Sequence, residues 1–192
     1  MSEPRVVHGD RPDRTAAVAL WTVVGAGCAL LVVRPSLVGR PWTPGALLGC
    51  YVVLGLIAVL APVPGRSRRW IGSVVVTIAG VAGVLVAASV LGPSFPLPRT
   101  GQILALNGVA AVAEELFFRR LVFGGLLRFG AVVAIGGSAL VFALVHVPIY
   151  GLGALPVDLG AGLLFSWQRW ASGGWGASAA THVFANLLAV LR

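Results

Sequence analysis

Apolar residues along this chain fall into seven long runs, separated by short connectors rich in Arg, Pro and Gly. A helix of about 20 apolar residues is long enough to cross the hydrocarbon core of a bilayer. The pattern therefore predicts an all-α fold, a polytopic transmembrane bundle of about seven helices. We expect these helices near residues 15–33, 45–63, 70–92, 102–127, 130–147, 152–168 and 174–191.

The N-terminus and the sixth run differ from the rest of the pattern. Residues 1–14 are polar and are expected to form a tail, so that 15–192 make up a single transmembrane domain. The sixth run contains Gly residues together with Pro156 and Asp158, which disfavour a regular helix. We therefore expect it to be a short, loosely packed helix that spans the bilayer either fully or only in part.

Composition supports a membrane location and argues against nucleic acid as a partner. The chain is 58% hydrophobic and 10% charged, whereas soluble domains contain roughly 25% charged residues. Its net charge of +8 comes from 14 Arg and no Lys. These arginines lie between the apolar runs instead of forming one basic face, which is typical of residues that flank membrane helices.

The distribution of arginines also predicts the orientation. Ten lie at predicted inner ends, including Arg119, Arg120 and Arg169, and four at predicted outer ends, including Arg34. Positive charge gathers on the cytoplasmic side, so we expect the N-terminus in the cytoplasm, in a bacterial cell membrane. If the sixth run does not span, the C-terminus lies on that side too.

Few ionisable residues interrupt the apolar runs. Beyond the first 13 residues the only acids are Glu114, Glu115 and Asp158, and the only histidines are His146 and His182. An ionised side chain at the bilayer centre costs about 2.5–3.5 kcal/mol on insertion scales. Such residues usually face a wet cavity, so the sequence predicts a polar site inside the membrane. Asp158 is expected to lie at the mouth of the short sixth helix or to line that cavity.

Helical spacing predicts which of these side chains share a face. Glu115 and Arg119 are four residues apart and are therefore expected to pair. Glu114 is rotated from Glu115 by about 100° around the helix and can point elsewhere. The alternative is a purely structural ion pair near a helix end, with the arginine reaching toward lipid headgroups.

Two further pairs have the same spacing. Phe142 and His146 share one helical face, and His182 and Asn186 share another. The second pair directs two hydrogen-bonding groups the same way and is able to donate to an anionic oxygen. The alternatives are an ordinary interfacial histidine and an interhelical hydrogen bond.

The three patterns together are specific. E-E-x-x-x-R, F-x-x-x-H and H-x-x-x-N, in this order on successive polar-bearing helices, resemble the CPBP intramembrane protease family. That family contains the CAAX-prenyl endopeptidases and the bacteriocin-processing or immunity proteins, and is also called Abi. The resemblance covers about residues 100–191 and implies that the last four helices form the catalytic core. It implies a membrane-associated peptide or protein as the substrate.

The resemblance also implies roles for six residues. Glu114 and His146 would activate a water for attack on a peptide carbonyl, His182 and Asn186 would stabilise the oxyanion, and Glu115 and Arg119 would hold the geometry. No cofactor is certain. Glu114, His146 and His182 would also suffice as three zinc ligands, although the chain has no H-E-x-x-H motif.

Two other functions are compatible with the residues. A non-catalytic scaffold or immunity protein of the same family would retain the site and act through binding. A proton-coupled carrier would use the two glutamates as a relay, but the internal repeats found in many transporters are not visible here. The chain is of bacterial type, so prenylated substrates are not expected.

Overall fold

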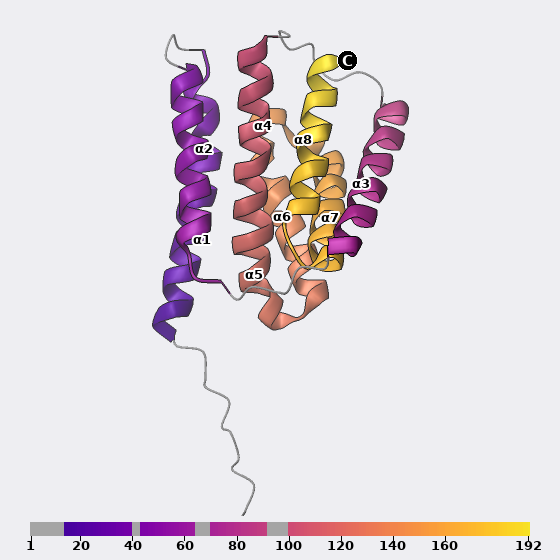
Figure 1. Cartoon of the computed structure of the whole chain (residues 1–192). Coiled ribbons are helices and arrows are strands. Elements are labelled where there is room, and N and C mark those ends of the chain that lie inside the picture. The colour runs from indigo at the N-terminus through magenta and orange to yellow at the C-terminus, as the bar shows by residue number, and fades with distance from the viewer. Residues whose placement is uncertain (1–13, 40–42, 64–69, 92–99) are drawn as a thin grey trace, which may run out of the picture.

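The computed structural model describes residues 14–39, 43–63, 70–91 and 100–192. Within these residues the chain forms seven long helical segments and no strand (Figure 1). The all-α prediction and the seven predicted runs are confirmed, with ends that differ by a few residues. The elements are α1 (Arg14–Val33), η1 (Arg34–Leu37), α2 (Thr43–Leu60), α3 (Trp70–Leu91), α4 (Gly101–Glu115), η2 (Leu116–Val122), α5 (Phe123–Leu126), η3 (Leu127–Phe129), α6 (Ala131–Tyr150), η4 (Leu152–Ala154), α7 (Leu155–Ser172) and α8 (Gly176–Leu191).

The helices have the length and surface of a membrane bundle. Five helical segments of the described chain are long and apolar enough to cross a bilayer, namely Arg14–Leu37, Thr43–Leu60, Gly72–Leu91, Gly101–Phe129 and Ala131–Tyr150. Large apolar side chains are exposed on the outside of the bundle, for example Val132 at 84% and Leu60 at 78%. The protein is therefore an integral, multi-pass membrane protein. The expected tail lies outside the described residues, apart from Arg14, where α1 begins.

The last four helical segments form the centre of the bundle. α6 packs along α7, α4 contacts both α2 and α8, and α3 packs against α7 and α8. In Figure 1, α1 and α2 stand on one side of α4, while α3 stands at the opposite edge. The buried core contains Phe117, Phe118 and Leu121, which lie in η2, the segment after the glutamate pair. The segment that carries the candidate chemistry is thus also the centre of the packing.

The helix that carries the glutamates changes its geometry directly after them. Residues of η2 are π-helical, and the N–H of Phe123 donates to the carbonyl of Phe118, five residues earlier. The Ser138 hydroxyl of α6 also donates to the Phe118 carbonyl, at 3.0 Å, and Nε of Arg169 in α7 donates to the carbonyl of Arg119, at 2.9 Å. π-Helical turns are rare and often lie at functional sites. This one is fixed by side chains from two neighbouring helices.

The expectation of a short, loosely packed sixth helix is wrong in part. α7 has 18 residues, with Pro156 in its first turn, where its missing N–H costs no hydrogen bond. It packs closely on α6 because Gly162 has no side chain where it meets Ala139. However, α7 is not among the five segments long and apolar enough to cross a bilayer. Gly162 thus allows close contact between α6 and α7 instead of loosening the helix.

The close approach of α7 to α6 predicts a contrast between two glycines of α7. A methyl group at Gly162 would lie 2.9 Å from the carbonyl oxygen of Ala139, whereas one at Gly160 would meet nothing within 4 Å. We expect Gly162→Ala to destabilise the protein by about 1–3 kcal/mol, the usual cost of overpacking. Gly160→Ala is the matched control and should be neutral or stabilising, because alanine favours helix. Thermal unfolding in detergent would measure both, and equal transition temperatures would contradict the prediction.

Candidate functional site

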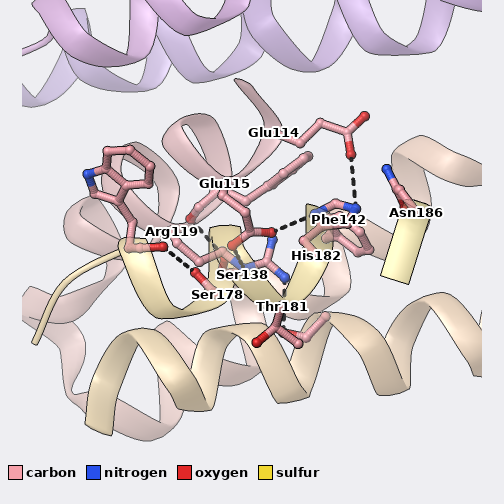
Figure 2. Close-up of polar contacts among 12 residues, drawn as sticks. Glu114, Glu115, Arg119, Ser138, Phe142, Ser178, Thr181, His182 and Asn186 are labelled. Carbon is pink, nitrogen blue, oxygen red and sulfur yellow. Dashed lines mark hydrogen bonds and ion pairs between the residues drawn. The ribbon is translucent and has the colours of Figure 1, made fainter. Parts of the chain in front are cut away.

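The two adjacent glutamates at the end of α4 are buried and have different partners. Glu114 is 3% exposed and Glu115 is fully buried. Oε1 of Glu114 accepts a hydrogen bond from Arg34 at 2.7 Å. Oε2 of Glu114 faces Nε2 of His146 at 3.7 Å and Nε2 of His182 at 3.9 Å. Figure 2 shows both carboxylates approaching the His182 region from α4.

Hydrogen bonds at Nδ1 orient both imidazole rings. Nδ1 of His146 donates to the carbonyl of Phe142 at 2.7 Å, one turn earlier in α6. Nδ1 of His182 lies 3.0 Å from Oε1 of Glu115, and an ionised carboxylate can only accept, so this nitrogen is the donor. When either ring is neutral, its Nε2 is therefore a hydrogen-bond acceptor. Both Nε2 atoms are directed to the same oxygen of Glu114.

The expected pair of Glu115 and Arg119 is present and lies deep in the protein. Nε of Arg119 is 3.3 Å from Oε2 of Glu115, and both side chains are fully buried. The guanidinium lies 4.6 Å from the ring centroid of Phe142 and 5.4 Å from that of Phe165, and it donates to the carbonyl of Gly162 at 3.2 Å. Arg119 therefore does not reach lipid headgroups. It links α4 to α6 and α7.

Asn186 lies at the edge of this cluster. It is one turn along α8 from His182 (Figure 2) and is partly buried. Its side-chain amide donates to the carbonyl of Asn107 in α4, at 3.3 Å.

The structure thus brings Glu114, Glu115, Arg119, His146 and His182 together through polar contacts and holds Asn186 beside them. Asp158, in the first turn of α7, is half-buried.

Sequence reasoning missed Arg34. It was counted as a flanking residue at an outer helix end, which is wrong, because it is 5% exposed and bound to Glu114. The same guanidinium nitrogen donates to the hydroxyl of Tyr51 at 2.7 Å. Arg169 was likewise counted as flanking and is buried. An arginine after an apolar run gives the same pattern whether it faces water or the interior, so the sequence holds no signal for the difference.

The two glutamates, their two arginine partners and the two imidazoles form a cluster that can bind and polarise a water molecule. Arg34 and Arg119 balance Glu114 and Glu115, so the cluster is neutral when both imidazoles are neutral. The separations of 3.7 and 3.9 Å exceed hydrogen-bond length. A water can bridge polar groups at such spacings. Oε2 of Glu114 and the two Nε2 atoms provide only acceptors, which favours the two hydrogens of a water.

The residues of this cluster are less suited to binding a metal ion than to binding a water molecule. Within the described residues no group of three or more His, Cys, Asp and Glu side chains is arranged to hold a metal ion. In addition, the cationic group of Arg34 already binds Glu114 at 2.7 Å and would repel a second cation there. Zinc ligation by Glu114, His146 and His182 remains a prediction from the sequence, and its donors would be Oε2 and the two Nε2 atoms.

An open apolar groove lies between α2 and α4, beside the polar cluster. Its volume is about 600 Å³, and its lining includes Tyr51, Gly55, Val59, Gly108, Val112 and Leu116. Tyr51 belongs both to the groove and to the polar cluster, because its hydroxyl accepts from Arg34. The groove therefore shares one residue with the polar cluster around Glu114.

The fold and the site together define a multi-pass membrane protein with a buried carboxylate–imidazole centre. Residues 96–188 match the family model described as type II CAAX prenyl endopeptidase Rce1-like. This segment contains all six candidate residues, and through it the chain is similar to the CAAX-type intramembrane proteases. Neither a curated protein nor a solved structure matches the chain significantly. Arg34 and Tyr51 lie outside the matched segment.

The buried pair of Glu115 and Arg119 predicts a strong stability effect. Arg119→Ala would leave Glu115 buried without its cation, and breaking a buried ion pair in this way costs about 3–5 kcal/mol. The double variant Glu115→Gln with Arg119→Met removes both charges and should recover part of that loss. Thermal unfolding of the wild type, the single variant and the double variant in detergent would test this. A double variant less stable than Arg119→Ala would contradict it.

Proposed function

We propose that this protein is an intramembrane endopeptidase that hydrolyses a peptide bond with a water activated by Glu114 and His146. The main support is the convergence of Glu114 Oε2 with the Nε2 atoms of His146 and His182, inside an apolar bundle. The family match to CAAX-type proteases points to the same reaction. The substrate is a membrane-associated peptide or protein.

The attacking water is held between Glu114 Oε2 and His146 Nε2. One of these two acceptors takes a proton from the water as its oxygen attacks the carbonyl carbon of the substrate. That proton then passes to the nitrogen of the leaving amine. A positioned general base of this kind contributes about 10²–10⁴-fold to the rate. The hydrogen bond from His146 Nδ1 to the Phe142 carbonyl keeps the ring in the required orientation.

The oxyanion is stabilised from α8. His182, when protonated, donates to the oxyanion through Nε2, while Glu115 accepts from its Nδ1 and fixes the orientation of the ring. Arg119 in turn holds Glu115. The amide of Asn186 supplies the second donor once it turns away from the Asn107 carbonyl. Donors fixed in a site that excludes bulk water stabilise a developing negative charge efficiently.

The groove between α2 and α4 accepts the apolar part of the substrate. It is open and lined by apolar side chains, and one of its lining residues, Tyr51, accepts a hydrogen bond from Arg34, the partner of Glu114. A substrate segment that lies in the bilayer would reach the water without first leaving the membrane. We expect the enzyme in a bacterial cell membrane with its N-terminus in the cytoplasm, where a signal-like or other non-prenylated membrane peptide is the fitting substrate class.

The role of Glu114 predicts a variant that folds but does not cleave. Glu114→Gln keeps the shape of the side chain and removes its ability to accept a proton, so cleavage of a membrane-peptide panel should fall by at least about 10²-fold. Purified wild type and variant are compared with and without a chelator. Cleavage that persists in chelator but is lost in Glu114→Gln supports the metal-free reaction. Loss in chelator that zinc restores would establish a zinc enzyme, and retained cleavage by Glu114→Gln would refute the role of Glu114.

The role of the groove predicts a change in substrate binding. Gly108 faces the groove and has no atom within 4 Å of an added Cβ. Gly108→Leu should therefore fill the groove without disturbing the fold, raising KM several-fold and leaving kcat near the wild-type value. Gly136 in α6 also has no atom within 4 Å of an added Cβ, so Gly136→Leu is the matched control. Equal KM values for the two variants would show that the substrate does not use this groove.

A further inference from the structure

We propose that Arg34 is a positioning residue of the active site, which binds one oxygen of Glu114 and thereby directs the other to the two imidazoles. This inference rests on the proposed function of Glu114. It extends the site beyond the segment that matches the protease family, because Arg34 precedes residue 96. The helices α1 and α2 would then complete the active site, in addition to enclosing it.

The geometry of Arg34 suits this role. A single nitrogen of its guanidinium lies 2.7 Å from Oε1 of Glu114 and 2.7 Å from the hydroxyl of Tyr51. The guanidinium carbon is 5.5 Å from the centre of the Tyr51 ring. The planar guanidinium holds its donors in a fixed pattern, so a residue bound to it loses rotational freedom. Glu114 is therefore held with Oε1 occupied and Oε2 facing the histidines.

Charge balance gives a second reason. Arg34 and Arg119 offset Glu114 and Glu115, and the Arg34 and Glu114 side chains are only 6% and 4% exposed. Without Arg34 the buried cluster would have a net charge of −1 with neutral imidazoles, and an uncompensated buried charge is costly. Glu114 would then have to turn to another partner or bind a proton. Either change would remove Oε2 of Glu114 as an acceptor for the water.

A merely structural arginine would behave differently from a positioning one. If Arg34 only fastened η1 to the bundle, its removal would lower stability, but the molecules that remained folded would turn over at the normal rate. If it bound the substrate, its removal would raise KM. A positioning residue of Glu114 instead affects kcat in folded enzyme.

The test compares Arg34→Met, Arg34→Lys and the control Arg128→Met in purified, reconstituted protein. Arg128 is an exposed residue beside Trp21 and Phe129, and it has no contact with Glu114 within the described residues. Its replacement by Met removes one positive charge, as Arg34→Met does. We expect Arg34→Met to lower kcat by about 10²-fold, as small displacements of a catalytic group do, with little change in KM. Arg34→Lys should recover part of the loss, and Arg128→Met should match the wild type.

Several outcomes would overturn the proposal. A wild-type kcat in Arg34→Met would do so, as would a loss confined to KM. If Arg34→Met does not fold, Arg34→Lys and Tyr51→Phe take its place. Tyr51→Phe removes only the hydroxyl that holds Arg34, and it should lower kcat less than the loss of Arg34 does. Unchanged kcat in both of these variants would overturn the proposal.

A stability cycle separates this inference from the proposed function. The fall in transition temperature caused by Arg34→Met should be smaller in a Glu114→Gln background than in the wild type, because the ion pair is already weakened there. Arg128→Met should cause the same change in both backgrounds. Equal effects of Arg34→Met in both backgrounds would overturn the role of Arg34, whatever the enzyme cleaves. A wild type that cleaves no membrane peptide contradicts the proposed function, and the coupling between Arg34 and Glu114 can still be measured.

Discussion

Two adjacent carboxylates that are ionised inside an apolar bundle each need a cation, and the arrangement of this site depends on that requirement. Glu115 is paired with Arg119 on its own helix, while Glu114 is paired with Arg34 from another part of the chain. The charges of the two arginines thus balance those of the two carboxylates inside the bundle.

The packing of the helices serves to hold these pairs in place. In the π-helical segment after Glu115, the carbonyls of Phe118 and Arg119 accept hydrogen bonds from side chains of α6 and α7. The guanidinium of Arg119 lies among aromatic rings and contacts the backbone of α7 at Gly162. The close contact of α6 with α7 is thus part of the arrangement that fixes the histidines relative to the glutamates.

The family-matched segment and the N-terminal helices contribute different parts of the site. Residues 96–188 provide the carboxylates, the imidazoles and the π-helical turn. The preceding helices provide Arg34, Tyr51 and one wall of the apolar groove. Tyr51 belongs to both the groove and the ion-pair network, so a substrate segment in the groove would lie next to the residues that hold Glu114.

The sequence by itself determined the class of fold, the seven helices and the six candidate residues, because apolar runs and i, i+4 spacing depend only on local order. It also predicted the pair of Glu115 and Arg119, which lie on one helix. It did not predict the π-helical turn, the tight contact at Gly162 or the burial of Arg169. Nor did it predict Arg34 as the partner of Glu114, 80 residues away in the chain. Contacts between distant segments depend on how the helices pack, and only the tertiary structure decided them.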